Sequence, residues 1–333
     1  MNLAADEAAP ALSIVIPTYN RRDELAAATA SLRQQSRGDF ECLIVDNGPS
    51  DDGTDEMCKA LTAEDPRFRY FQIGAIGIFP SCNHGLRQAR GRILMTMDDD
   101  VEFTDTSTID FIVDCFDDDP GMGLMQLSEY RPDGRLRGGG GSGDHSPRNY
   151  WRDTTMYPPG KVNRWGFIGT RQHLLRFGEM HEVDQVRSAA MPFRREAYEQ
   201  VGGFHEPYVV LGRGYRCETD LCLRIKHAGW RVMFAARDPQ VLHKAAPKTR
   251  GWRRGGGDAN YIYATNRNNL YFFLRNFWSP WSAPIFFLWD VLVGGTQQPG
   301  AFRLLRQRQL SPWAWWITMK GKCAGLVHYY RAG

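Results

Sequence analysis

The sequence has no apolar run long enough to cross a bilayer, which takes roughly 18 to 20 residues. Its longest apolar segment, Ala283 to Val293, is shorter and contains Asp290. The stretch from Met1 to Pro10 is acidic and has no apolar centre, so we expect no secretory signal there. These features favour a protein that is soluble or lies on a membrane surface.

A disulfide framework is also missing. The seven cysteines are odd in number and scattered, and no two of them form a C-x-x-C pair. This usage is typical of reduced thiols in a reducing compartment. We therefore expect a cytoplasmic location, with the inner face of the membrane as a site of association.

The chain has little net charge, +3, but its charge is unevenly placed. From Lys244 to the last residue there are 13 lysines and arginines against two acidic residues. The same region is rich in aromatic residues: Trp278, Trp281, Phe286, Phe287, Trp289, Trp313, Trp315 and Trp316. Interleaved basic and aromatic residues suit a membrane interface. The alternative is a helical appendage that packs on the core or forms a homodimer interface, and no recognition module indicates a nucleic-acid partner.

Through the first 243 residues, short apolar segments alternate with amphipathic ones at about 30 residues per cycle, as in βαβ units. The pattern predicts strands at 12–16, 41–45, 68–73, 93–97, 122–127, 186–191, 232–235 and 241–243. It predicts helices at 22–35, 54–63, 81–89, 109–116, 194–201, 217–228 and 261–277. These elements indicate an α/β fold built on a parallel sheet.

Three consecutive aspartates, Asp98, Asp99 and Asp100, end the apolar run at 93–97. Like charges this close repel, so a folded protein keeps them together with a compensating partner. Mg²⁺ or Mn²⁺ is the natural partner, because both bind oxygen ligands and are often shared with substrate phosphates. The carboxyl end of a strand in an α/β sheet is also where a ligand is expected. The alternative is a solvated acidic turn.

Two further features follow the aspartates at a distance. Glu218 and Asp220 open the predicted helix at 217–228, and His243 follows the last predicted strand. Taken alone, the acids are explained by the helix dipole and the histidine by ordinary packing. The glycine-rich segment 137–143 lacks the Gly-Lys-Ser/Thr ending of a phosphate-binding loop, so we expect a mobile surface loop there.

Six sequence blocks stand in a fixed order: 13–21 (SIVIPTYNR), 44–54 (IVDNG and DDGT), 83–91 (NHG and ARG), 97–100 (MDDD), 193–204 (FRRE and VGGF) and 218–224 (ETDLCLR). Together they resemble family 2 of the inverting nucleotide-sugar glycosyltransferases, over residues 12 to 278. The resemblance implies the GT-A fold, a Rossmann-like three-layer sandwich with a mixed, mostly parallel sheet. This domain would occupy 1–243, and a helical extension would occupy 244–333.

The resemblance also implies roles for individual residues. The nucleotide-sugar site would include Pro17, Thr18, Asn20, Arg21, Asp46, Asp98 and Asp99. Asp98 and Asp100 would form the Asp-x-Asp pair, and Asp100 with His243 would hold Mn²⁺ or Mg²⁺. Glu218 would be the catalytic base that deprotonates the acceptor hydroxyl.

The implied function is metal-dependent, inverting transfer of one sugar, a hexosyl or deoxyhexosyl group, in cell-surface glycan synthesis. The donor would be a UDP- or dTDP-sugar, and the acceptor a glycan or lipid-linked intermediate. His205 stands where family members usually have Asp in Gly-Gly-Phe-Asp-Glu, which weakens inference about the acceptor. The Gln-x-x-Arg-Trp signature of processive synthases is absent, which favours a single transfer. Two alternatives are a sugar-nucleotide nucleotidyltransferase, although 17–20 is no glycine-rich basic loop, and a non-catalytic sugar-nucleotide-binding protein.

Overall fold

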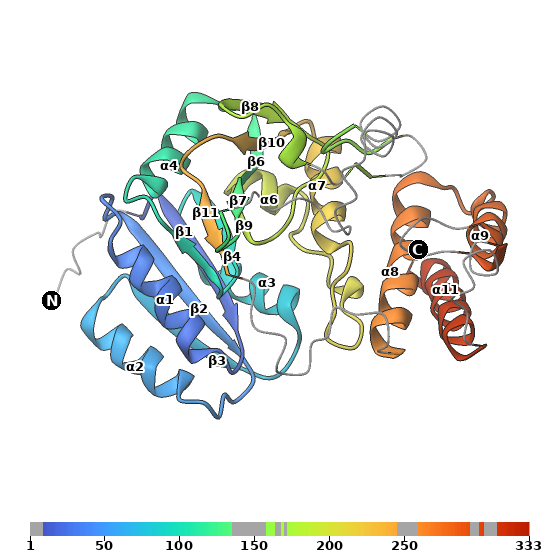
Figure 1. The fold of residues 1–333 in the computed structure, drawn as a ribbon, viewed down its shortest axis with the longest axis horizontal. Coiled ribbons are helices and arrows are strands. Elements are labelled where there is room, and N and C mark those ends of the chain that lie inside the picture. The colour runs from blue at the N-terminus through green and yellow to red at the C-terminus, as the bar shows by residue number, and fades with distance from the viewer. Residues whose placement is uncertain are drawn as a thin grey trace, which may run out of the picture.

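An eight-stranded mixed sheet organises the structure, a computed structural model that describes residues 9–134, 158–163, 168–169, 172–244, 259–293, 300–302 and 312–332 (Figure 1). The strands lie in the order β3-β2-β1-β4-β9-β6-β10-β8. β9 is antiparallel to β4 and β6, β8 is antiparallel to β10, and the other pairs are parallel. The strands are β1 (Leu12–Thr18), β2 (Phe40–Asn47), β3 (Phe68–Ile73), β4 (Ile93–Met97), β6 (Met122–Leu127), β8 (Glu179–Glu182), β9 (Ala190–Arg194) and β10 (Arg231–Ala236).

A second, three-stranded sheet lies beyond the end of β4. Its order is β5-β11-β7, from β5 (Val101–Phe103), β11 (Val241–His243) and β7 (Glu129–Tyr130). β11 pairs with β5 in antiparallel register, so His243 stands opposite Val101. On its other side β11 runs parallel to β7, and Val241 stands opposite Glu129. This sheet brings segments from three distant parts of the chain to one place.

Helices cover both faces of the large sheet and make a three-layer sandwich. Alternate residues of each strand point to opposite faces, so Ile14 belongs to the buried cluster that includes Leu25 of α1, whereas Val15 belongs to the cluster that includes Phe79 of α3. Gly85 lets α3 approach β1 closely, because a Cβ there would lie 2.5 Å from Val15 Cγ1. The helices of the sandwich are α1 (Arg22–Arg33), α2 (Thr54–Glu64), α3 (Ile78–Gln88), α4 (Thr108–Asp118), α6 (Arg195–Gln200) and α7 (Cys217–His227).

Three C-terminal helices form a group beside the sandwich, at the right of Figure 1. They are α8 (Ala259–Phe277), α9 (Ala283–Leu292) and α11 (Pro312–Ala332). Residues of α8 such as Leu270 and Phe272 share one buried cluster with Leu221 of α7 and Phe193 of β9. None of the described helices has both the length and the apolar character needed to cross a membrane.

The predicted α/β sandwich with a mixed, mostly parallel sheet and C-terminal helices is confirmed. One predicted strand, 186–191, is wrong in its bounds, because the backbone N–H of Arg187 donates to the side chain of Gln126 and not to a neighbouring strand. The short strands β5, β7 and β8 were not predicted. The glycine-rich segment 137–143 and the basic segment 245–258 lie outside the described residues.

Candidate active site

The three aspartates form the turn between β4 and β5, and their side chains divide into two groups. The middle residue, Asp99, is 5% exposed. It accepts a hydrogen bond from Thr18 Oγ1 at 2.9 Å and pairs with Arg21 at 2.9 Å. Burial raises the pKa of Asp99 to about 7, against the lowering effect of Arg21. Asp99 therefore ties the end of β1 to the turn.

The outer aspartates and His243 converge. One ligand atom each from Asp98, Asp100 and His243 all lie within 4.8 Å of one another. His243 Nε2 lies 3.3 Å from Asp100 Oδ1, and Arg21 Nη2 lies 3.1 Å from Asp100 Oδ2. Two carboxylates and an imidazole are a donor set that suits Mn²⁺ or Mg²⁺. These three side chains are a possible metal group, and the burial of Asp99 and Asp100 differs from a solvated acidic turn.

His243 is nearly buried and lies between two carboxylates. Its Nδ1 lies 2.9 Å from Glu129 Oε2. Burial by itself lowers the pKa of His243, but the hydrogen bonds to Asp100 and Glu129 outweigh it and raise the pKa to about 9. A raised pKa favours the doubly protonated ring, whose positive charge balances the carboxylates of Asp100 and Glu129. A divalent cation bound at Nε2 would replace the proton there and supply positive charge in its place.

Glu218 stands in the first turn of α7 and is partly exposed. Ser188 Oγ donates to its Oε1 at 3.4 Å. Burial, with a smaller contribution from the carboxylate of Asp98, raises the pKa of Glu218 above the usual glutamate value. The two carboxylates are thus close enough for their charges to interact across 120 residues of sequence. A carboxylate with a raised pKa beside a candidate metal group is suited to proton transfer.

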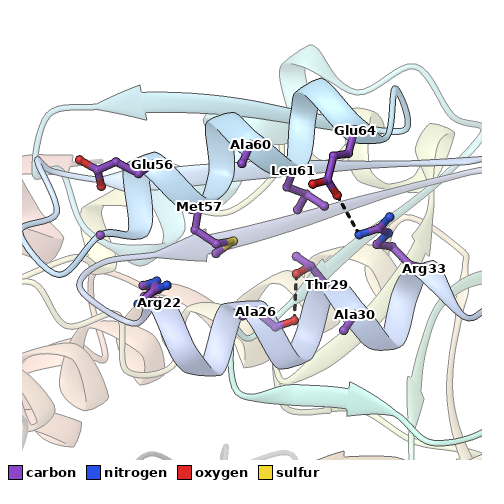
Figure 2. Close-up of a pocket in the computed structure, with 11 residues that line it drawn as sticks. Arg22, Ala26, Thr29, Ala30, Arg33, Glu56, Met57, Ala60, Leu61 and Glu64 are labelled. Carbon is purple, nitrogen blue, oxygen red and sulfur yellow. Dashed lines mark hydrogen bonds and ion pairs between the residues drawn. The ribbon is translucent and has the colours of Figure 1, made fainter.

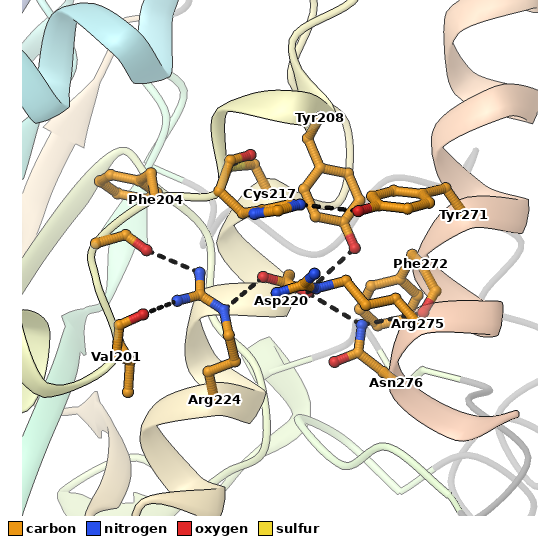
Figure 3. Close-up of polar contacts among 12 residues, drawn as sticks. Val201, Phe204, Tyr208, Cys217, Asp220, Arg224, Tyr271, Phe272, Arg275 and Asn276 are labelled. Carbon is orange, nitrogen blue, oxygen red and sulfur yellow. Dashed lines mark hydrogen bonds and ion pairs between the residues drawn. The ribbon is translucent and has the colours of Figure 1, made fainter. Parts of the chain in front are cut away.

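Asp220, two residues on, has a different environment (Figure 3). It is fully buried and accepts hydrogen bonds from Tyr208 Oη, Arg224 Nε, Arg275 Nε and Asn276 Nδ2 at 2.7–3.3 Å. Arg275 and Asn276 belong to α8, so Asp220 joins α7 to the C-terminal helices. Of the two acids at this helix start, Asp220 is structural.

The nucleotide-pocket residues predicted from the first two strands lie together at their carboxyl ends. Asp46 is buried and accepts hydrogen bonds from Tyr70 Oη and Ser50 Oγ. The backbone N–H of Asn20 donates to the same Ser50 hydroxyl, and its side-chain oxygen accepts from Asp51 N. Pro17 is buried within β1, where Val45 of β2 stands opposite it. Asp46 therefore serves at least partly to hold two loops together.

His205, the departure from the family pattern, faces α8. Its Nε2 lies 2.8 Å from Tyr271 Oη, and the two rings stack with centroids 5.9 Å apart. Burial and the nearby Arg275 guanidinium lower the pKa of His205 to about 4. His205 thus belongs to the same junction as Asp220.

A groove of about 620 Å³ lies between α1 and α2 (Figure 2). Its wall includes Met57 and Leu61, and its end is crossed by the exposed ion pair of Arg33 and Glu64. None of the predicted site residues lines this groove. It is separate from the candidate active site.

Sequence reasoning missed two residues of the site, Glu129 and Gln126, both buried. Asp98 was marked because it directly follows an apolar strand, and Glu129 has a similar position, one residue further from the end of β6. Arg21 was expected at the nucleotide, and its contacts with Asp99 and Asp100 were not foreseen.

The mixed sheet is covered on both faces and has the aspartate turn at the end of β4, and its similarity to solved glycosyltransferases shows the GT-A fold. Residues 13–201 match the family described as Glycosyl transferase family 2, and the chain belongs to that family. The structure is similar to the mannosyltransferase PcManGT from Pyrobaculum calidifontis, solved with GDP-Man and Mn²⁺. The TM-score is 0.53 at 16% identity, covering 97% of this chain and 87% of that one.

Two relatives extend the comparison. The O-antigen biosynthesis protein RfbC of Myxococcus xanthus is 27% identical over 245 residues, 72% of this chain and 18% of RfbC. The N-acetylglucosaminyl-diphospho-decaprenol L-rhamnosyltransferase of Mycobacterium tuberculosis is 27% identical over 299 residues, 82% of this chain and 87% of that protein. The chain spans a quarter or less of the length of two of the curated relatives that it matches, RfbC among them.

Proposed function

We propose that this protein is an inverting glycosyltransferase that moves one sugar from a nucleotide-diphosphate donor to an acceptor hydroxyl. The observation that carries the proposal is the group of Asp98, Asp100 and His243 within 4.8 Å, with Glu218 near enough to feel the charge of Asp98. Membership of family 2 supports this function over the nucleotidyltransferase alternative.

In the proposed reaction Glu218 accepts the proton of the acceptor hydroxyl as its oxygen bonds to the anomeric carbon. The bond from that carbon to the donor phosphate breaks, and the electron pair leaves with the nucleoside diphosphate. Attack on the face opposite the leaving group inverts the anomeric centre. Asp98, Asp100 and His243 would hold Mn²⁺ or Mg²⁺, which supplies positive charge to the leaving diphosphate.

We propose a UDP- or dTDP-sugar as donor and a hydroxyl of a lipid-linked glycan intermediate as acceptor. The name of the mycobacterial rhamnosyltransferase, an enzyme acting on a diphospho-decaprenol compound, supports the acceptor class. A transferred deoxyhexose would fit the same relative, and a transferred hexose would fit the mannosyltransferase. We further propose that the protein acts in glycan biosynthesis at the cytoplasmic face of the membrane. The exposed aromatic residues of the C-terminal helices support this location.

The test is a panel of UDP-, dTDP- and GDP-sugars assayed for Mn²⁺-dependent donor turnover, first alone and then with polyprenyl-diphosphate-linked acceptors. Glu218→Gln should reduce turnover by roughly 100-fold or more, because general-base catalysis contributes 10² to 10⁴. Donor binding should be retained, because Glu218 is proposed to act on the acceptor. Glu199→Gln, an exposed glutamate on α6, is the matched control. Undiminished turnover in E218Q would remove Glu218 as the base, and no turnover of any donor by the wild type would contradict the function.

A further inference from the structure

A buried carboxylate, Glu129, lies behind the candidate metal group. Glu129 is 3% exposed, and its neighbour Gln126 is fully buried. Neither residue belongs to the six sequence blocks that carry the family resemblance. Burying a carboxylate destabilises the fold unless its oxygens accept hydrogen bonds. The contacts of Glu129 therefore indicate its role.

The hydrogen bonds around Glu129 have directions that chemistry fixes. The backbone N–H of Arg187 can only donate, and it donates to Gln126 Oε1 at 3.0 Å. The amide nitrogen of Gln126 must then be the atom that faces Glu129, and it donates to Oε1 at 2.7 Å. The other oxygen, Oε2, lies 2.9 Å from Nδ1 of His243. A chain of hydrogen bonds therefore links the backbone N–H of Arg187, through Gln126 and Glu129, to the ring of His243, a candidate metal ligand.

These hydrogen bonds determine which ring nitrogen of His243 carries the proton. A carboxylate oxygen accepts, so Nδ1 must carry the proton, and Nε2 is the nitrogen left to bind a cation. Nε2 is also the nitrogen that faces Asp100, at 3.3 Å. Metal-binding histidines elsewhere are oriented by just such a carboxylate on the second ring nitrogen.

The backbone supports the same arrangement. β11, which carries His243, lies between β5 and β7. β5 begins directly after Asp100, and the backbone N–H of Lys244 donates to the Asp100 carbonyl at 3.0 Å. β7 begins with Glu129. The small sheet thus fixes the metal ligands on one side of His243 and the carboxylate on the other.

We propose that Glu129, held by Gln126, is a positioning residue that keeps His243 in the Nδ1–H tautomer and presents Nε2 to a divalent cation. This inference rests on the proposed function, because it takes the group of Asp98, Asp100 and His243 as a cation site.

The test measures Mn²⁺ binding to the whole chain without any donor, by isothermal titration and by quantifying free Mn²⁺ with electron paramagnetic resonance. A pulsed resonance measurement adds a second readout, the coupling of a histidine nitrogen to bound Mn²⁺. In E129Q one of the two oxygens that accept from Gln126 Nε2 and His243 Nδ1 becomes an amide donor, so Mn²⁺ should bind roughly 10- to 100-fold more weakly, as for other outer-shell substitutions. The nitrogen coupling should weaken with it.

Two further variants serve as controls for E129Q. E129D keeps two carboxylate oxygens and should bind Mn²⁺ more tightly than E129Q. Glu102→Gln alters another carboxylate of the same small sheet, whose partner is Lys244, and should bind as the wild type does. Wild-type affinity and nitrogen coupling in E129Q would overturn the inference alone. A wild type that binds no Mn²⁺ through a histidine nitrogen would overturn the proposed cation site and the inference with it.

Discussion

The proposed base, Glu218, lies in an environment that raises its pKa above the usual glutamate value. Its carboxyl is held in a low-dielectric setting next to Asp98, and both effects favour the protonated form, so its pKa is raised. A general base acts only when deprotonated, so activity should fall as pH drops through that raised pKa. We expect the acidic limb of the kcat profile above 4.5, the ordinary value for glutamate.

The measurement is donor turnover at saturating Mn²⁺ between pH 4 and 9, with circular dichroism at each pH to confirm folding. The residual activity of E218Q should lack this limb, because the amide does not titrate there. A wild-type profile that stays flat down to pH 4.5 would contradict the expected limb. An unchanged limb in E218Q would assign the acidic loss to another group.

Individual site residues differ in how far sequence could predict them. Asp98, Asp100 and His243 could be found because charged or metal-binding side chains stand at the ends of apolar strands, and the structure brings them together. Glu129 has the same kind of position and escaped notice because its strand has only two residues. The contact of Glu129 with His243 is set by pairing between β7 and β11, whose paired residues are 112 positions apart, and no local pattern contains that pairing.

At the level of elements, the junction between α7 and α8 depends on Asp220 (Figure 3). Asp220→Ala should destabilise the fold by about 3 kcal/mol, because it leaves the guanidinium groups of Arg224 and Arg275 without their carboxylate in a buried setting. Arg176→Ala is the matched control, since its ion pair with Glu179 is 82% and 47% exposed and should be worth about 0.5 kcal/mol or less.

Urea unfolding of both variants gives the two free energies directly. A loss below about 1 kcal/mol in D220A would mean that solvent replaces the lost contacts, as at exposed ion pairs, and that the junction rests on apolar packing. The sequence could not separate Glu218 from Asp220, because both acids suit a helix start. The tertiary contacts of Asp220, among them Arg275 and Asn276 of α8, distinguish the structural acid from the candidate base.

Most elements could be predicted because their signals are local: short apolar runs for strands, and one apolar face for helices. The predicted strand 186–191 begins too early, because residues 185–187 make polar contacts outside the sheet. It also ends too early, because Pro192 interrupts the apolar pattern within β9. Its antiparallel direction comes from pairing with β4, whose sequence separation is about a hundred residues. Long-range pairing is the part of this fold that periodicity does not encode.

Across the whole molecule, the helical extension and the sandwich share one buried cluster. Leu270, Phe272 and Leu274 of α8 pack in the same cluster as Leu221 and Phe193 of the sandwich. We therefore expect a single cooperative unfolding transition in calorimetry, with equal calorimetric and van't Hoff enthalpies. Lys322→Ala should lower the midpoint of that single transition, because it leaves the buried carboxylate of Asp290 without the ammonium group 2.5 Å away. Two transitions, with the lower one alone shifted in K322A, would instead support separate units at 1–243 and 244–333.

The C-terminal helices present apolar side chains to solvent. On and just before α9, Trp281, Ile285 and Leu288 are 92%, 67% and 59% exposed, at helical spacing. The only acidic residue after position 258 is Asp290, and it is buried against Lys322. Lys320 and Arg331 of α11 are exposed. An apolar face near cationic groups and without exposed acids complements an anionic lipid surface.

We therefore expect the protein to co-sediment with phosphatidylglycerol vesicles more than with phosphatidylcholine vesicles, and less as salt rises. The double change Ile285→Ser and Leu288→Ser should weaken binding by roughly 10-fold or more, since burying each side chain is worth about 1.5 kcal/mol or more. Phe177→Ser, which alters a solvent-facing apolar residue of the sandwich that is 50% exposed, should have no effect. If neither vesicle binds the wild type and the double variant instead converts a dimer to a monomer, the face is a contact between copies of this chain. Binding that survives the double change would place the lipid contact away from Ile285 and Leu288.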